Sequence, residues 1–124
     1  MKNPFVKQTV SGDWFYMNST AVTVRDIDNS LKNYESITTE IWEDLGVLEV
    51  NLSEKLSLDF EALKPYFKDK EGQEYLQKND IHALFMVTFE AQDYALVEPI
   101  MKHITKNLDG FFCEDTIDFS NIIR

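Results

Sequence analysis

The residues best able to do chemistry are few and stand apart in the sequence. The two histidines, His82 and His103, lie on different predicted elements, and no His-x-x-x-His pair is present. A metal site needs several convergent ligands, so we expect structural or surface roles for both histidines and no metal site. Cys113 is the only cysteine, and it is followed by Glu114 and Asp115. A reactive thiolate needs a nearby cation or a helix N-terminus, so we expect a buried, inert thiol.

Motifs for catalysis are absent from the sequence as well. The four glycines form no phosphate-binding loop, and no G-x-S-x-G sequence occurs. The segment that starts at Asp26 begins like a calcium loop, but Leu31 stands where the loop needs glycine. With 22 acidic residues in 124, pairs of carboxylates at any spacing are expected by chance. The sequence therefore predicts no catalytic residue, no cofactor and no enzymatic activity.

Charge and composition limit the class of partner. The chain has 124 residues, a net charge of −10 and a pI near 4.5. This length fits one domain over residues 1–124, and a hydrophobic fraction of 44% argues against disorder. The acidic balance excludes direct binding to nucleic acid or to anionic membranes. One cysteine, no signal peptide and no apolar stretch of membrane-spanning length predict a cytoplasmic protein.

Two groups of acids beside aromatic residues are candidate partner-binding surfaces. The first ends a predicted helix and comprises Glu40, Trp42, Glu43 and Asp44. The second lies near the C-terminus and comprises Glu114, Asp115 and Asp118, beside Phe112 and Phe119. Acids at a helix C-terminus oppose the helix dipole, and this local cost suggests that the first group is used. The alternative for both groups is an ordinary solvated surface.

The first half of the chain predicts strands, then a helix, then another strand. Residues 5–10 and 14–17 are strand-like with a turn between them, and residues 21–24 follow as a further strand, which gives a hairpin or a meander. Apolar residues three or four positions apart predict a helix over 28–45, capped by Asp28 and ended by Gly46. Alternation over 47–52 predicts a strand with one solvated face.

The second half predicts a strand, a helix and a strand. Residues 53–80 are mixed, with a short helix over 71–78, and residues 81–89 form a central strand covered on both faces. The next helix spans 93–108, and either it begins near Glu98 with Pro99 in its first turn, or it begins at Asp93 and kinks. Residues 111–113 and 116–119 follow as one bulged strand or a hairpin. The expected fold is α+β, with a single-layer, mostly antiparallel sheet packed against two main helices.

The closing stretch carries a family resemblance. The sequence HALFMVTF at 82–89, followed by PIMKHITKNLDGFFCEDTIDF at 99–119, resembles the immunity proteins of bacterial toxin systems, including those of contact-dependent inhibition and of other polymorphic toxins. The resemblance implies a partner rather than a substrate. An acidic surface would plug the basic active-site cleft of a cognate toxin, often a nuclease, and electrostatic steering would speed the association.

Two other hypotheses remain open at this point. One is a small ligand-binding or enzymatic α+β domain, whose apolar residues line a pocket. The other is an adaptor that mimics the charge of a nucleic acid, which requires a regular row of carboxylates on the folded surface. No such regular spacing is visible in the sequence itself.

Overall fold

The computed structural model describes residues 10–124, and all structural statements below concern these residues. Six antiparallel strands form one open sheet in the order β2-β3-β4-β5-β1-β6. The strands are β1 (Asp13–Asn18), β2 (Thr38–Trp42), β3 (Val47–Asn51), β4 (Ser57–Leu63), β5 (Ala83–Thr88) and β6 (Phe111–Glu114). The helices are α1 (Val24–Ser30), α2 (Lys70–Lys78) and α3 (Tyr94–Leu108), with short 3-10 turns at Glu43–Leu45 and Ala91–Asp93. The α+β prediction is confirmed.

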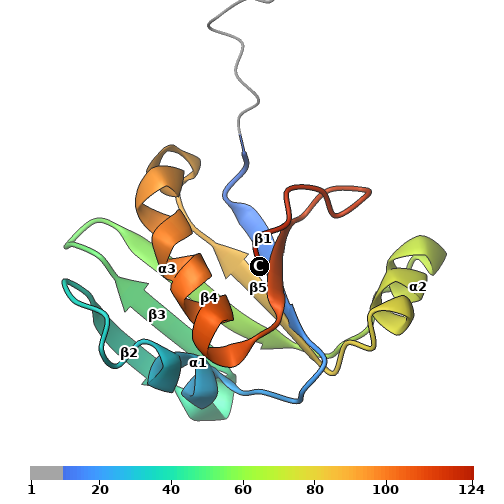
Figure 1. Ribbon diagram of the computed structural model, residues 1–124, viewed down its shortest axis with the longest axis horizontal. Coiled ribbons are helices and arrows are strands. Elements are labelled where there is room, and N and C mark those ends of the chain that lie inside the picture. Colours follow the sequence, from blue (N-terminus) through green and yellow to red (C-terminus); the bar gives the residue numbers. More distant parts are fainter. Residues whose placement is uncertain (1–9) are drawn as a thin grey trace, which may run out of the picture.

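Two hydrophobic clusters hold the layers together. In Figure 1, α1 and α3 lie in front of the sheet, and α2 stands at the right. The main cluster lies between the sheet and the pair α1 and α3, and it includes Tyr16, Phe60, Phe85 and Phe112. A smaller cluster joins α2 to the opposite face of β1, β5 and β6 through Leu76 and its neighbours. That opposite face is therefore covered at one end of the sheet only.

The helix predicted over 28–45 is wrong. The structure has a short helix, α1, over Val24–Ser30 and a strand, β2, over Thr38–Trp42. The helical spacing of apolar residues is real, but the segment TTEIW is rich in β-branched and aromatic residues, which favour a pleated surface. Pairing of Thr39 with Val50 and of Ile41 with Leu48 then decides the outcome. Gly46 does adopt the left-handed conformation, but it ends the 3-10 turn.

The predicted strand at 21–24 and the cap at Asp28 are also wrong, because α1 begins earlier. Thr23 is the N-cap, and its hydroxyl accepts a hydrogen bond from the Asp26 backbone N–H at 3.3 Å. The Asp26 carboxylate in turn accepts from the Thr23 N–H at 2.8 Å, which completes a capping box. Asp28 accepts instead from the Thr39 hydroxyl at 2.8 Å. This bond ties α1 to β2.

The cap gives a direct test of where α1 begins. Thr23→Ala is expected to lower the free energy of unfolding by about 1 kcal/mol, because the Asp26 backbone N–H in the first turn loses its hydrogen-bond acceptor. Urea denaturation followed by circular dichroism measures the change. Asn29→Ala, at an exposed position later in α1, is the control and should leave stability nearly unchanged. Equal values for the two variants would contradict the assigned start.

Strand β1 does not form a local hairpin. Its two sides are paired with β5 and β6, and residues 21–24 enter α1. The predicted strand at 5–10 lies mostly outside the described residues, of which only Val10 is part. The C-terminal strand–helix–strand unit, β5-α3-β6, is confirmed, with β1 lying between its two strands.

Details of the last third settle the remaining alternatives. Helix α3 begins at Tyr94 and holds Pro99 inside it, so the start near Asp93 was the correct alternative. The strand β6 covers Phe111–Glu114, whereas residues 116–119 form no strand. Strand β5 is covered on both faces except at Met86, which is 40% exposed. The described helices include none that is both long and apolar enough to cross a bilayer.

Candidate partner-binding surface

The sheet face turned away from α1 and α3 is open over β2, β3 and β4. Side chains alternate along each strand, and the positions that alternate with buried Leu48, Val50 and Phe60 point to this face. No helix of the described chain packs over this part, because α2 contacts β1, β5 and β6. We call the uncovered part, over β2 to β4 and Met86 of β5, the open face.

Strand register places carboxylates on the open face in a line. Glu40 of β2 is paired with Glu49 of β3, and Glu49 is paired with Asp59 of β4. The line continues through Thr88 of β5 to Asp13 of β1. Neighbouring strands are about 4.8 Å apart, so the acids recur at a regular interval. This regular row was not visible in the sequence.

A second row on the open face is more apolar. It runs from Trp42 through Val47 and Glu61 to Met86, one residue from each successive strand. Trp42 is 43% exposed and Met86 is 40% exposed. Tryptophan is one of the residue types enriched in binding hot spots. The open face therefore offers both charge and apolar contact area.

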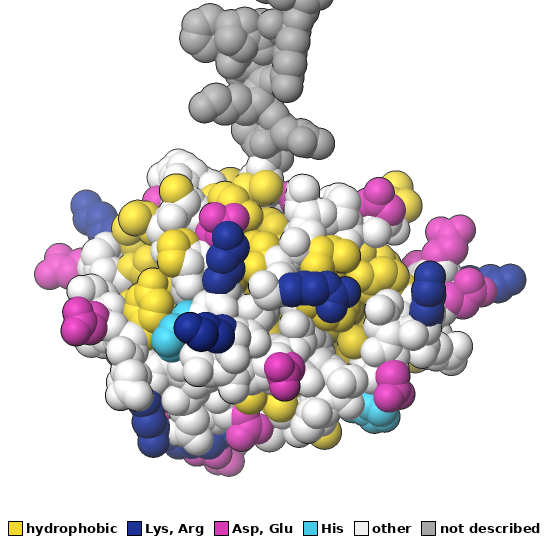
Figure 2. Space-filling model, in the orientation of Figure 1, with side chains coloured by type: hydrophobic (Ala, Val, Ile, Leu, Met, Phe, Trp, Pro, Cys, Tyr) yellow, Lys and Arg dark blue, Asp and Glu magenta, His cyan; other side chains and the backbone are white. Residues whose placement is uncertain are grey.

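The charge of the sheet is of one sign. None of the six described strands contains Lys or Arg, whereas the strands carry the acids of the row, Glu61 and Glu114. The ion pairs found within residues 10–124 involve other acids: Arg25 with Asp28 and Glu43, and Lys70 with Glu74. Figure 2 shows that the helical face, by contrast, carries dark-blue basic side chains among magenta acidic ones.

Asp59 is the member of the row that is least well solvated. Its Oδ1 atom is buried and accepts no hydrogen bond from the described residues. Burial is the largest cause that raises the pKa of Asp59, and the negative charge of Glu49 raises it further, although the Ser57 hydroxyl lowers it in part. Like charges directly opposite one another across strands are destabilising. Burial and the charge of Glu49 thus both disfavour the ionised form of the Asp59 carboxyl.

Asp59→Asn is expected to raise the free energy of unfolding at pH 7 by about 0.5–1 kcal/mol. A carboxyl whose pKa is raised on folding costs stability where it is ionised, and the cost vanishes below its unfolded pKa of about 3.9. The gain should therefore be present at pH 7 and absent at pH 3. Urea denaturation at both pH values measures it, with Glu74→Gln in α2 as the control. A loss of stability at pH 7 would contradict the assignment.

The first sequence-predicted group is only partly brought together. Glu40 and Trp42 lie on the open face, on the same side of β2. Glu43 and Asp44 lie exposed in the 3-10 turn that follows β2, and Glu43 is bound by Arg25. Since no helix ends there, the argument from the helix dipole was wrong. Glu40 and Trp42 are nevertheless exposed, and their role in binding a partner stays a prediction.

The second predicted group is divided by the fold. Glu114 is 5% exposed, and its carboxylate accepts from the Ser11 backbone N–H and from Asn121 Nδ2, each at 2.6 Å. It is therefore a structural group and not a surface group. Phe112 and Phe119 are core residues. Asp115 and Asp118 are exposed at the start and in the middle of the loop after β6. The Asp115 N–H donates to the Asp13 backbone oxygen at 2.9 Å, so Asp115 lies beside the β1 end of the acidic line rather than over β2 to β4.

Four members of the open face were missed as site residues: Glu49, Asp59, Glu61 and Met86. Each stands at a polar or outward position of an alternating strand, and this pattern is readable in the sequence. What the sequence lacks is the register that sets these positions side by side.

Among the described residues, no cluster of three His, Cys, Asp or Glu side chains is arranged to hold a metal ion.

The histidines and the cysteine occupy positions without converging groups. The His82 ring lies at the surface near the backbone oxygens of Ser19 and Asp80. His103 on α3 packs edge-on against Tyr34, with 5.0 Å between ring centres. Cys113 is fully buried, and burial, followed by the charge of Asp115, raises the pKa of its thiol to about 12. The expectation of a buried, inert thiol agrees with this environment.

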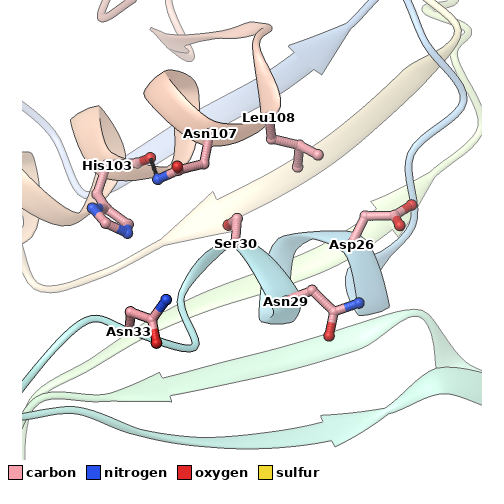
Figure 3. Close-up of a pocket in the computed structure, with 7 residues that line it drawn as sticks. All are labelled: Asp26, Asn29, Ser30, Asn33, His103, Asn107 and Leu108. Atoms are coloured by element: carbon pink, nitrogen blue, oxygen red, sulfur yellow. Dashed lines mark hydrogen bonds between the residues drawn. The ribbon is translucent and has the colours of Figure 1, made fainter.

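A groove between α1 and α3 is one of several hollows outside the open face. Figure 3 shows it lined by residues of both helices and of the turn after α1, and its volume is about 380 Å³. Leu108 is the one apolar side chain among its seven lining residues. Three of the polar ones already serve local hydrogen bonds: Asp26, Ser30 and Asn107. This groove is not the apolar pocket that the ligand-binding hypothesis predicts.

Known proteins provide no family assignment. Comparisons with protein-family models, with curated proteins and with solved structures give no match.

Proposed function

We propose that this chain is a cytoplasmic immunity or inhibitor protein that binds and neutralises a cognate bacterial toxin through the open face. The observation that carries the proposal is the row formed by Glu40, Glu49 and Asp59 on strands that contain no basic residue. An uncovered acidic sheet with an exposed tryptophan at its edge is complementary to a basic protein surface. No catalytic role is part of the proposal.

The regular row also favours one class of toxin. A nuclease holds its substrate in a basic cleft, because phosphate binding needs Lys and Arg. Carboxylates at strand spacing present such a cleft with a line of negative charge, as a nucleic acid strand does. Long-range attraction would speed the encounter, and Trp42 and Met86 would supply the apolar contacts that hold the complex. We therefore expect the cognate toxin to be a nuclease.

The decisive experiment is protection of cells. The toxin domain encoded beside the gene for this chain is expressed in a sensitive host, with and without the chain. We expect growth with the chain and also with Glu74→Lys, which changes an exposed acid of α2 outside the open face. The double variant Glu40→Lys, Glu49→Lys should fold and give no protection. Growth with that double variant, or death with the unaltered chain, would contradict the proposal.

A further inference from the structure

The two edges of the sheet are finished differently. At the β6 edge, the Phe112 and Ile123 backbones exchange hydrogen bonds of 2.8 Å in both directions, and Glu114 N–H donates to Ser120 O at 3.1 Å. The C-terminal segment thus covers this edge. At the other edge, β2 has β3 on one side, and the backbones of residues 10–124 supply no partner for the other side. Among residues 10–124, one edge is therefore closed and the other is open.

Hydrogen bonds at both ends of the β3–β4 pair show which groups of β2 face outward. Ala62 N–H donates to Gly46 O at 2.7 Å, and Leu52 N–H donates to Leu56 O at 2.8 Å. Bonded and non-bonded pairs alternate in antiparallel strands, so the even-numbered residues of β3 bond to β4 and the odd-numbered ones bond to β2. The β2 residues bonded to β3 are Thr38, Glu40 and Trp42.

It follows that Thr39 and Ile41 direct their backbone N–H and C=O groups away from the sheet. A strand added at this edge would bond to these two residues. Glu40 lies between them, in a position where the added strand would form a non-bonded pair. In such pairs the side chains approach most closely. The residue of the added strand opposite Glu40 would therefore lie beside its carboxylate, on the open face.

Charge decides what kind of strand can be added. A second copy of the chain would use both outward residues of each β2 only if Thr39 bonded to Ile41 of the other copy. That register places Glu40 directly against the other Glu40, which is unfavourable. Glu49 stands immediately behind Glu40 in the row and adds to the repulsion. A strand with Lys or Arg opposite Glu40 meets attraction instead, and exposed Trp42 can contact the same cation.

We propose that the open edge of β2 accepts an extended basic segment of the partner protein, which pairs with the backbone of Thr39 and Ile41 and places a Lys or Arg side chain against Glu40. This inference rests on the proposed function for the identity of the partner. It adds that the contact includes backbone pairing, so that the partner continues the sheet rather than only lying on its face.

Amide hydrogen exchange of the full chain tests the pairing. In the free protein, the amides of Thr39 and Ile41 should exchange fast, and those of Glu40 and Trp42 slowly. The probe is a capped seven-residue peptide of alternating Lys and Val. At about 90% saturation the peptide should slow exchange at Thr39 and Ile41 by about tenfold. The same peptide with N-methyl groups on its Val residues, and a Glu and Val peptide, should have no such effect.

The outcomes separate the two proposals. If the Lys peptide shifts resonances of Glu40 and Glu49 but leaves exchange at Thr39 and Ile41 unchanged, or does not bind, the edge inference is wrong, and the toxin experiment above still decides the function. Equal protection by the N-methylated or the acidic peptide overturns it as well. If exchange at Thr39 and Ile41 slows as the concentration of the chain itself rises, without peptide, then a second copy of the chain pairs with the edge. That result also overturns the inference. If the Lys peptide slows exchange at Thr39 and Ile41, but the chain does not protect cells from the toxin, the edge inference is supported and the proposed function is rejected.

Discussion

Glu49→Lys is expected to weaken binding of the toxin domain by about 100- to 1,000-fold. Glu49 is the middle member of the row, paired with Glu40 on one side and Asp59 on the other. It also borders both hollows of the open face, of about 490 and 180 Å³. Loss of one member of a buried interfacial charge pair costs about 2–5 kcal/mol, and about 1.4 kcal/mol corresponds to a tenfold change.

The same substitution should not harm the fold. Replacing Glu49 by Lys removes two like-charge contacts across strands and creates two attractive ones, so we expect an unfolding free energy equal to or above that of the unaltered chain. Titration calorimetry at two salt concentrations measures the binding. Glu74→Lys, with the same change in net charge, should bind almost normally. If both variants lose affinity equally, net charge and not the open face controls binding.

Glu114→Ala is expected to have the opposite profile, with loss of stability and little direct effect on affinity. The Glu114 carboxylate joins the Ser11 backbone to Asn121, and it is 5% exposed. Its removal leaves two partly buried donors without a partner, which costs about 2–4 kcal/mol. Urea denaturation measures the loss. Asp118→Ala, at an exposed position of the same predicted group, is the matched control and should change stability little.

Glu114 should also contribute to acid sensitivity. Burial by itself raises its pKa, but the hydrogen bonds from the Ser11 backbone and from Asn121 outweigh burial and lower the pKa. A carboxyl whose pKa is lowered on folding stabilises above its unfolded pKa, about 4.3, and this contribution is lost as pH falls through the folded pKa. The Glu114→Ala variant should therefore be much closer in stability to the unaltered chain at pH 2 than at pH 7. A difference that stays constant over this range would contradict the charged hydrogen bonds.

The alternation of apolar and polar residues predicted a strand correctly where every apolar position is buried on the same face of the sheet. Leu48 and Val50 are fully buried on one side of β3, and Glu49 points to the other side, as the pattern indicated. The strand–helix–strand unit at the C-terminus also followed from its pattern, because the apolar positions Val97, Ile100 and Ile104 of α3 repeat at helical spacing and are buried.

The first helix was predicted in the wrong place because the apolar residues between 28 and 45 repeat at helical spacing, although part of this segment is a strand. Leu31 and Ile41 are both partly or fully buried, but Leu31 packs beside α1, whereas Ile41 belongs to a strand. Pairing with β3 rewards an extended chain at Thr38–Trp42, and only tertiary contacts supply that stabilisation. The β-branched and aromatic residues of TTEIW favour a strand locally, but the pairing with β3 that decides the outcome is not visible in the local sequence.

The composition of the open face could be predicted in part. Glu40 and Trp42 were identified from composition alone, and they lie on the open face. The partners of Glu40 could not be found, because Glu49 and Asp59 become neighbours only through strand register. For Glu114, sequence shows an acid near a strand end but not the donors from Ser11 and Asn121 that draw it inward.

The strands β2, β3 and β4 follow one another along the chain and also lie next to one another in the sheet. Nearly the whole open face is therefore encoded by one continuous stretch, residues 38–63, while β1, β5, α3 and β6 build most of the remaining core. A change of partner would require new outward residues in this meander alone. Exchange of one short gene segment, for residues 38–63, could therefore change the partner while the rest of the fold stays the same.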